Sequence, residues 1–252
     1  MSTEGRKDRI AKAFSASALG YDAAADVQWL VANRLAEKIE NARIPPKARI
    51  LEIGCGTGFL SARLIEAFPQ GDLTLTDIAP SMLERCRARV GDGPRYKVLD
   101  GERPEALGEE RFDLIASSLA LQWFVDLPGG LARLAGLLAP GGRMMFATLG
   151  QQTFAEWRAA HAALGLHCGT PEYPAAAAFP WPSGFAHRVE EDLVSHAYAD
   201  GTDFVRSLKA LGAGEPAPGH RPLSAGHFRR LLASLDGGFI VAYHLLYGEI
   251  LA

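Results

Sequence analysis

One stretch constrains the fold of this chain more than any other. The segment from Arg49 to Phe59 reads RILEIGCGTGF, so a short apolar run rich in β-branched residues ends in three glycines at alternate positions. A helix-like pattern follows over residues 61–68. Because glycine lacks a Cβ, the backbone here can turn sharply and approach a bound molecule closely. The pattern predicts a nucleotide-type pocket at the carboxyl end of a first sheet strand.

Composition argues against two classes of partner. The chain has 252 residues, of which 48% are hydrophobic and 22% are charged, as is ordinary for a globule with a sizeable core. A formal net charge of −3 argues against a protein that coats nucleic acid. No apolar run reaches the ~20 residues of a membrane span. We therefore expect neither nucleic acid nor a membrane as a partner.

The N-terminus and the cysteines indicate a cytoplasmic protein. The first nine residues are polar and lead into no signal-like apolar segment. Cys55, Cys86 and Cys168 are odd in number and far apart, as in a protein kept reduced. His161 and His167 lie near Cys168, but such spacing is common by chance, and no metal site is predicted.

Strand-like and helix-like segments alternate through the middle of the chain. Such alternation requires parallel crossovers and predicts an α/β fold with a doubly wound sheet. The predicted strands span residues 50–53, 72–77, 96–100, 112–116 and 143–149. The predicted helices between them span residues 61–68, 81–90 and 131–138.

The flanks of this core are mainly helical. Apolar residues at helical spacing predict two helices within residues 6–41, broken at Gly20 and followed by two prolines. After Gly150, the predicted elements are helices over 153–164, 202–211 and 224–235, a loop or short helix over 168–187, a strand over 188–198 and a hairpin-like strand over 239–251. We interpret the chain as a single domain, with an N-terminal helical lid (1–45), a core (46–150) and substrate and lid elements (151–252).

The spacing of the glycines excludes two common phosphate-binding loops. Gly54, Gly56 and Gly58 do not follow the G-x-G-x-x-G pattern of dinucleotide sites, and no Lys-Ser/Thr pair follows as in a P-loop. A glycine loop by itself can also be no more than a tight turn.

Three acidic residues favour a cationic ligand without phosphates. Asp77 ends the second strand, where a carboxylate can accept hydrogen bonds from both hydroxyls of a ribose. Asp100 ends the third strand, where it can meet an exocyclic amine, and Glu52 precedes the first glycine. Acidic groups attract a cation and repel phosphates. S-adenosylmethionine carries an adenosine, an ammonium and a sulfonium, and its charges fit this pattern.

Five segments together resemble the class I S-adenosylmethionine-dependent methyltransferases: LEIGCGTG, TDIAPSML, the Asp100 loop, FDLIASSLALQW and LAPGGRMMF. The resemblance implies a Rossmann-like sheet of seven strands, mostly parallel with an antiparallel C-terminal strand. It also implies S-adenosyl-L-methionine as methyl donor and S-adenosyl-L-homocysteine as product. The cofactor-binding residues it implies are Glu52, Gly54, Gly56, Gly58, Asp77, Ile78, Met82, Asp100, Gly101 and Leu119. For Met82, packing in a helix core is the alternative.

The flanks carry a second resemblance, which covers nearly the whole chain. FSASALGYDAAADVQ, SSLALQWF, FVRSLKALGA and AYHLLYGEI are similar to the malonyl-acyl-carrier-protein O-methyltransferase family of biotin synthesis. In that family the enzyme esterifies the free carboxyl of malonyl on the phosphopantetheine arm of acyl carrier protein, and the ester primes pimeloyl assembly. Residues 167–187 follow the family only loosely, so the acyl group accepted can differ from malonyl.

The chemistry that this resemblance implies needs no general base. A carboxylate with a pKa near ~4 is already ionised at neutral pH. Catalysis then comes from holding its oxygen in line with the methyl group in a dry pocket. We expect no catalytic base.

Four residues are candidates for the substrate site, each with an alternative. Tyr21 is the preferred pocket residue of the N-terminal helices, with half-buried packing as its other interpretation. Trp123 follows the fourth strand and suits an aromatic pocket wall or the core. Arg206 and Lys209 lie three apart on one helix face, where they either bind the substrate or its carrier or are simply solvated. Candidates for docking an acidic carrier are Arg6, Lys7, Arg9, Lys12, Arg221, Arg229 and Arg230.

Two other functions remain open at this point. One is a methyltransferase for a free small carboxylic acid or another small metabolite. The other is a protein that binds S-adenosylmethionine or its product without turnover.

Overall fold

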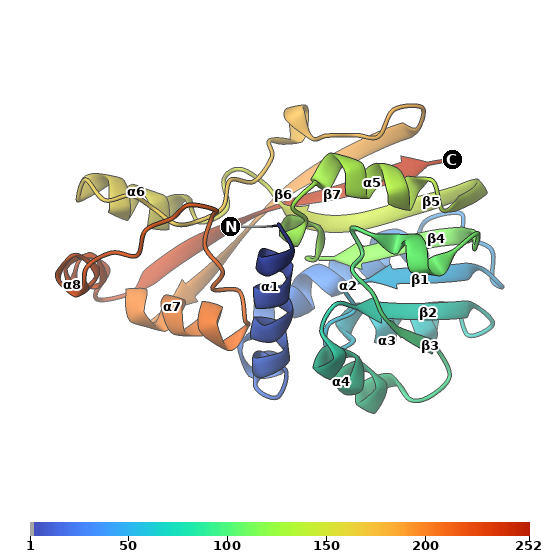
Figure 1. Cartoon of the computed structure of the whole chain (residues 1–252), viewed down its shortest axis with the longest axis horizontal. Coiled ribbons are helices and arrows are strands. Elements are labelled where there is room, and N and C mark those ends of the chain that lie inside the picture. The colour runs from blue at the N-terminus through green and yellow to red at the C-terminus, as the bar shows by residue number, and fades with distance from the viewer. Residues whose placement is uncertain (1–2) are drawn as a thin grey trace.

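A seven-stranded sheet runs through the protein in the order β3-β2-β1-β4-β5-β7-β6 (Figure 1). The computed structural model describes residues 3–252. The pairs among β1 to β5 are parallel, and β7 is antiparallel to both β5 and β6. The strands are β1 (Arg49–Ile53), β2 (Asp72–Asp77), β3 (Arg95–Val98), β4 (Phe112–Ser118), β5 (Leu138–Leu149), β6 (Ala186–Tyr198) and β7 (Phe239–Leu251). The predicted doubly wound, mostly parallel sheet with an antiparallel C-terminal strand is confirmed.

Helices cover both faces of this sheet. In β1, Ile50 belongs to a core cluster with residues of α2, α3 and α4, whereas Leu51 belongs to a second cluster with residues of α5. Successive side chains of a strand point to opposite faces, so both faces of β1 are buried, as is usual for parallel sheets. The α-helices are α1 (Thr3–Ser17), α2 (Asp26–Glu40), α3 (Phe59–Ala67), α4 (Pro80–Val90), α5 (Leu127–Ala135), α6 (Ala155–Ala163), α7 (Gly201–Ala210) and α8 (Ala225–Ala233). Short 3-10 helices are η1 (Tyr21–Ala24), η2 (Pro104–Leu107), η3 (Leu121–Trp123) and η4 (Ala176–Ala178).

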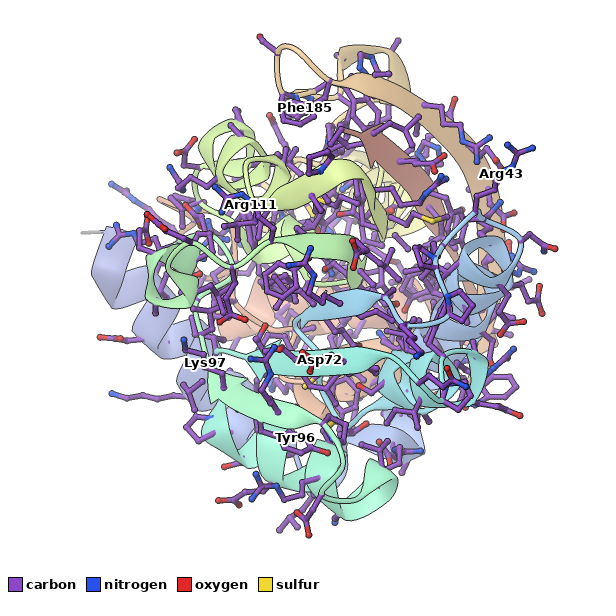
Figure 2. The ribbon with its side chains drawn as sticks, turned by 90° about the vertical axis from the view of Figure 1, so that its right-hand side faces the viewer. Arg43, Asp72, Tyr96, Lys97, Arg111 and Phe185 are labelled. Atoms are coloured by element: carbon purple, nitrogen blue, oxygen red, sulfur yellow. The ribbon has the colours of Figure 1, made fainter. Side chains whose placement is uncertain are left out.

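The strands β3 and β6 form the two edges of the sheet. Figure 2 shows Tyr96 and Lys97 on β3 beside Asp72 of β2, with Phe185, the residue just before β6, on the opposite side. On this strand, the Lys97 ammonium donates a hydrogen bond to the backbone carbonyl of Ala106 in η2. A short edge strand with a lysine resists pairing with a second sheet.

The helix before β5 starts and ends earlier than the predicted 131–138. The Asp126 carboxylate accepts a hydrogen bond from the N–H of Gly129 and so caps the first turn of α5. Pro128 lies in that first turn, where its missing N–H costs no helical hydrogen bond. Both features start the helix at Leu127. The spacing of apolar residues alone does not predict this start.

The fifth strand starts earlier than the predicted 143–149, because the Pro140-Gly-Gly segment lies within β5. The register between β4 and β5 shifts there, from Phe112 opposite Leu138 to Leu114 opposite Arg143. The extra residues on β5 therefore form a bulge, a feature that keeps a strand continuous while it bends.

The C-terminal strand was expected to be hairpin-like, and β7 does pair with β6 along the whole length of both strands. The two strands are not joined by a tight turn, because α7 and α8 lie between them in the sequence. In Figure 1 both helices lie beyond one end of the β6–β7 pair, next to α6. Among the described residues, no helix is both long and apolar enough to cross a membrane.

Replacing Gly248 by alanine should destabilise the fold. A Cβ on Gly248 of β7 would lie 2.2 Å from the Phe146 ring, which is fully buried. Overpacking of this kind costs about 1–3 kcal/mol, so we expect a lower free energy of unfolding in denaturant titrations. Gly93→Ala is the control, because a Cβ there meets nothing within 4 Å. Equal stability of the two variants would contradict the packing described for β7.

Candidate active site

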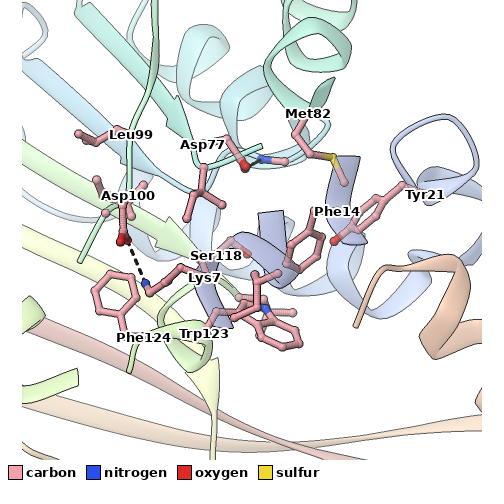
Figure 3. Close-up of a pocket in the computed structure, with 18 residues that line it drawn as sticks. Lys7, Phe14, Tyr21, Asp77, Met82, Leu99, Asp100, Ser118, Trp123 and Phe124 are labelled. Atoms are coloured by element: carbon pink, nitrogen blue, oxygen red, sulfur yellow. Dashed lines mark hydrogen bonds and ion pairs between the residues drawn. The ribbon is translucent and has the colours of Figure 1, made fainter. Parts of the chain in front are cut away.

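A cavity opens where the carboxyl ends of β1 to β4 face the N-terminal helix α1 (Figure 3). With its mouth it encloses about 660 Å³, within the size range of small-molecule sites. Most of the predicted cofactor and substrate residues meet along its wall. They are Tyr21, Gly54, Gly56, Asp77, Ile78, Met82, Asp100, Gly101, Leu119 and Trp123. The other lining residues are Lys7, Ile10, Phe14, Ile53, Leu99, Ser118, Ala120 and Phe124.

The glycine loop between β1 and α3 forms the floor of the cavity. Gly54, Gly56 and Gly58 all have positive φ angles, of +69°, +54° and +93°. A Cβ on Gly54 would lie 2.4 Å from the Cβ of Ala120, whereas one on Gly56 would meet nothing within 4 Å. Gly54 thus permits close packing of the loop, and Gly56 leaves open space. Gly58 does not line the cavity; it caps α3, with the Cys86 sulfur 3.0 Å from where its Cβ would be.

Asp77 ties this loop to the next strand. Its Oδ2 accepts a hydrogen bond from the N–H of Gly56 at 2.9 Å, and its Oδ1 accepts one from the N–H of Ala79 at 2.8 Å. Burial raises the pKa of Asp77 to about 6, and these backbone N–H groups oppose that shift. The carboxylate is 7% exposed and lies on the cavity wall. Figure 3 shows Asp77 between Leu99 and Met82.

Asp100 and Gly101 follow β3 and reach the same cavity. A Cβ on Gly101 would lie 2.2 Å from Cγ2 of Ile53, so only glycine lets this loop lie against β1. Oδ1 of Asp100 accepts a hydrogen bond from the Lys7 ammonium at 2.9 Å, drawn as a dashed line in Figure 3. Leu119, at the end of β4, has φ +51°, which is rare for a residue with a side chain.

Aromatic residues from two distant segments close the other side of the cavity. Phe14 of α1 contacts Trp123 of η3 edge to face, with ring centroids 5.4 Å apart. Tyr21 lies nearby and packs with Met82 and Phe14 (Figure 3). Burial, and then Asp77, raise the pKa of Tyr21 far above its usual range, so its hydroxyl stays protonated. Met82 is 1% exposed, so it both fills this small core and lines the cavity.

Glu52 lies behind the cavity wall and does not line it. It is 1% exposed, and its Oε2 accepts a hydrogen bond from the Ser61 hydroxyl at 2.6 Å. Burial is the main cause that raises its pKa to about 8, although the Ser61 hydrogen bond opposes the shift. At neutral pH Glu52 is therefore mostly neutral, and the expected negative charge beside the glycines comes from Asp77.

A second, larger cavity adjoins the first, and Trp123 lines both. It lies between α6, α7, α8 and the loops 169–173 and 213–223, and with its mouth it encloses about 1250 Å³. Its wall is mainly apolar and aromatic. The large apolar side chains that line it are Phe154, Trp157, Tyr173, Val205, Leu208, Leu223 and Phe228. The two cavities together extend from the glycine loop to the C-terminal helices.

The two basic candidates of α7 differ in their placement. Lys209 lines the second cavity, although it is also exposed to solvent. The Arg206 side chain is 73% exposed, lines neither cavity and lies 3.8 Å from the Asp203 carboxylate. The spacing of three residues therefore does not bring both charges to one cavity.

Comparisons with known proteins agree with this arrangement. A methyltransferase domain family model matches residues 51–144, which include the glycine loop and the strands around it. Over 96% of its length, the chain is 45% identical to the malonyl-[acyl-carrier protein] O-methyltransferase of Magnetococcus marinus and covers 92% of that protein. The chain belongs to the malonyl-[acyl-carrier protein] O-methyltransferase family.

Other relatives extend this result. The chain is 44% identical over 95% of its length to the biotin biosynthesis bifunctional protein of Bordetella avium, of which it spans 51%. It is 33% identical over 95% of its length to the family member of Halorhodospira halophila, of which it covers 86%.

Solved structures share the fold at low sequence identity. The YcgJ protein of Bacillus subtilis has a TM-score of 0.56 at 13% identity, with 86% of this chain and 97% of that one covered. The magnesium protoporphyrin IX methyltransferase of Synechocystis, solved with bound S-adenosylhomocysteine, has a TM-score of 0.53 at 14% identity. This structural match covers 89% of this chain and 83% of that one.

Sequence reasoning missed the contribution of α1 to the cavity. Lys7, Ile10 and Phe14 are spaced three and four residues apart, so they share one helix face, and all three line the cavity. This spacing is visible in the sequence and could have predicted that the three residues share one helix face. Lys7 was instead grouped with the candidates for carrier docking, but it forms ion pairs inside the protein, and Arg9 pairs with Glu215.

Glu52→Gln should change how stability depends on pH. A carboxyl whose folded-state pKa of about 8 exceeds its unfolded value of 4.5 favours folding below pH 4.5, and this contribution is lost as the pH rises through 8. The variant lacks this loss, so its free energy of unfolding should rise relative to the wild type between pH 4.5 and 8, by a few kcal/mol. Denaturant titrations across this range measure the difference. Glu84→Gln, an exposed site on α4, is the control; parallel curves for all three proteins would show that Glu52 is not buried as described.

Proposed function

We propose that this protein transfers a methyl group from S-adenosyl-L-methionine to the free carboxylate of malonyl-acyl carrier protein. The observation that supports the proposal most is the pair of adjoining cavities that share Trp123. One is lined by glycines and carboxylates, and the other is mainly apolar. A donor and a long acceptor arm can therefore meet at one aromatic residue. Malonyl-acyl carrier protein is proposed as the acceptor because the relatives are named for it.

The first cavity suits the donor in its charge and its shape. Asp77 would hold the ribose hydroxyls, Asp100 the adenine amine, and Gly54 and Gly56 the methionine part. The open space at Gly56 is where a side chain would obstruct a ligand. When bound, the sulfonium of S-adenosyl-L-methionine supplies the methyl group. Gly58 and Glu52 would act indirectly, Gly58 by shaping the loop and Glu52 by bonding to Ser61 in α3.

The acceptor carboxylate needs a hydrogen-bond donor but no base. It is ionised at neutral pH, so its oxygen is already nucleophilic. The Tyr21 hydroxyl stays protonated, lines the first cavity and has no hydrogen-bond partner among the described residues. We infer that it donates to the malonyl carboxylate. Phe14 and Trp123 would exclude water around the reacting atoms, which strengthens that hydrogen bond.

The second cavity would take the phosphopantetheine arm. Its apolar wall suits the methylene and amide groups of the arm, and Lys209 on that wall can contact a polar group. Carrier proteins are acidic, so basic residues near the mouth favour docking. The exposed arginines on the segments that wall this cavity are Arg206, Arg221, Arg229 and Arg230. Residues 1–45, 46–150 and 151–252 would then act together as one catalytic domain.

Methyl transfer can be tested directly with a labelled donor. Malonyl-acyl carrier protein incubated with the enzyme and methyl-labelled S-adenosyl-L-methionine should gain the label, whereas carrier with an unacylated arm should not. Added salt should lower the rate steeply, because it screens the attraction between carrier and enzyme. Faster labelling of free malonic acid than of the carrier adduct would favour a small-acid methyltransferase instead.

Tyr21→Phe should lower kcat while donor binding stays nearly unchanged. A hydrogen bond to a charged group contributes about 1.5–3 kcal/mol, so we expect a fall in kcat of about 10- to 100-fold. Steady-state kinetics and calorimetric titration with S-adenosylhomocysteine measure the two effects separately. Tyr96→Phe, on the edge strand β3, should leave both unchanged. An unchanged kcat in Tyr21→Phe would remove Tyr21 from the acceptor site.

A further inference from the structure

Lys7 is the one side chain of α1 that brings a full charge to the wall of the donor cavity within the described residues. Its ammonium lies 2.9 Å from Oδ1 of Asp100 and 2.7 Å from Oε2 of Glu102, and its side chain is only 15% exposed. It also lies 5.1 Å from the ring centroid of Phe124. A lysine held by two carboxylates and an aromatic face is fixed in position, unlike a solvated surface lysine.

Glu102 anchors Lys7 independently of Asp100. It is 5% exposed and accepts hydrogen bonds from the N–H groups of Val125 and Asp126, at 2.7 and 2.8 Å. Burial alone would raise the pKa of Glu102, but Lys7 and these two N–H groups together lower it below its usual value. Glu102 therefore stays ionised at neutral pH, and a buried carboxylate with this many donors holds the ammonium in place.

The two oxygens of Asp100 have different surroundings. Oδ1 accepts from Lys7 and from the N–H of Glu102, at 2.9 and 3.1 Å. Oδ2 has no hydrogen-bond partner within residues 5–252. Since Asp100 lines the cavity, Lys7 fixes the carboxylate with one oxygen occupied and the other available to a ligand.

We infer that Lys7 is a positioning residue for the nucleobase: it orients Asp100 so that Oδ2 accepts a hydrogen bond from the exocyclic amine of adenine. The inference rests on the proposed function, because it requires an adenosyl donor. The N-terminal helix then contributes to choosing the base as well as covering the cavity. A carbonyl at the same position of the purine would meet a carboxylate oxygen, acceptor against acceptor, and would be rejected.

The test compares two ligands that differ only at that amine. S-adenosylhomocysteine carries the amine, and S-inosylhomocysteine carries a carbonyl in its place. In isothermal titration, the full-length wild type should bind the adenosyl ligand more tightly. Lys7→Met should weaken adenosyl binding by about 10-fold, the loss expected for one charge-assisted hydrogen bond. Its effect on the inosyl ligand should be within about twofold, so the preference for adenine shrinks.

A double-mutant cycle separates positioning from simple anchoring of α1. If Lys7 acts through Asp100, then Lys7→Met adds little to the loss caused by Asp100→Ala, whereas independent effects would multiply. Lys12→Met, at an exposed position of the same helix, is the matched control and should bind both ligands as the wild type does. If Lys7→Met fails to fold by circular dichroism, Lys7→Gln replaces it, because it removes the charge but keeps an N–H donor.

The outcomes distinguish this inference from the proposed function. Equal losses for both ligands in Lys7→Met, or no loss for either, would overturn the positioning role while the adenosyl donor stands. Failure of the wild type to bind S-adenosylhomocysteine would overturn both the inference and the donor assignment. A selective loss for the adenosyl ligand that disappears in the Asp100→Ala background supports it.

Discussion

The cavity at the carboxyl ends of β1 to β4 depends on one carboxylate, whose two oxygens each accept a hydrogen bond from a backbone N–H. Asp77 accepts the N–H of Gly56 in the loop after β1 and the N–H of Ala79 at the start of α4. These two bonds hold the ends of neighbouring parallel strands in one arrangement, so a ligand meets a preformed wall. The raised pKa of Asp77 is the cost of burying this charge. Pockets at strand ends are common in such sheets, and here the local constraint that shapes the pocket is this carboxylate.

Much of this architecture could be predicted from local pattern. The alternation of strands and helices gave the sheet, and the spacing of Gly54, Gly56 and Gly58 with Asp77 gave the pocket, because the carboxyl ends of parallel strands meet at one edge. What could not be predicted came from contacts distant in sequence. Nothing local shows that Lys7 reaches Asp100, that Glu52 lies behind the wall, or that Arg206 points away. Burial and pairing decide these, and both are properties of the assembled chain.

The sheet forms the first cavity, and the flanking helices and loops form the second. This difference explains why the donor was easier to infer from the sequence than the acceptor. At its strand ends the sheet carries a glycine loop and carboxylates, and these short motifs can be recognised in a sequence. The second cavity is built from ordinary apolar residues of α6, α7, α8 and two loops, and such residues look like core in a sequence. One fold hosts many acceptors for this reason, and the identity of the acceptor rests on relatives that match along nearly the whole chain.

The position of β7 has a consequence for how the molecule is made. This last strand is inserted between β5 and β6, and β6 pairs with no other strand in the part of the chain that the structure describes. During synthesis, β6 leaves the ribosome well before the residues that join it to the sheet. The glycine-loop half can assemble early, since its contacts are closer in sequence, whereas the walls of the second cavity wait for the final residues. A nascent chain would therefore complete the cavity at the glycine loop before the second cavity has its walls.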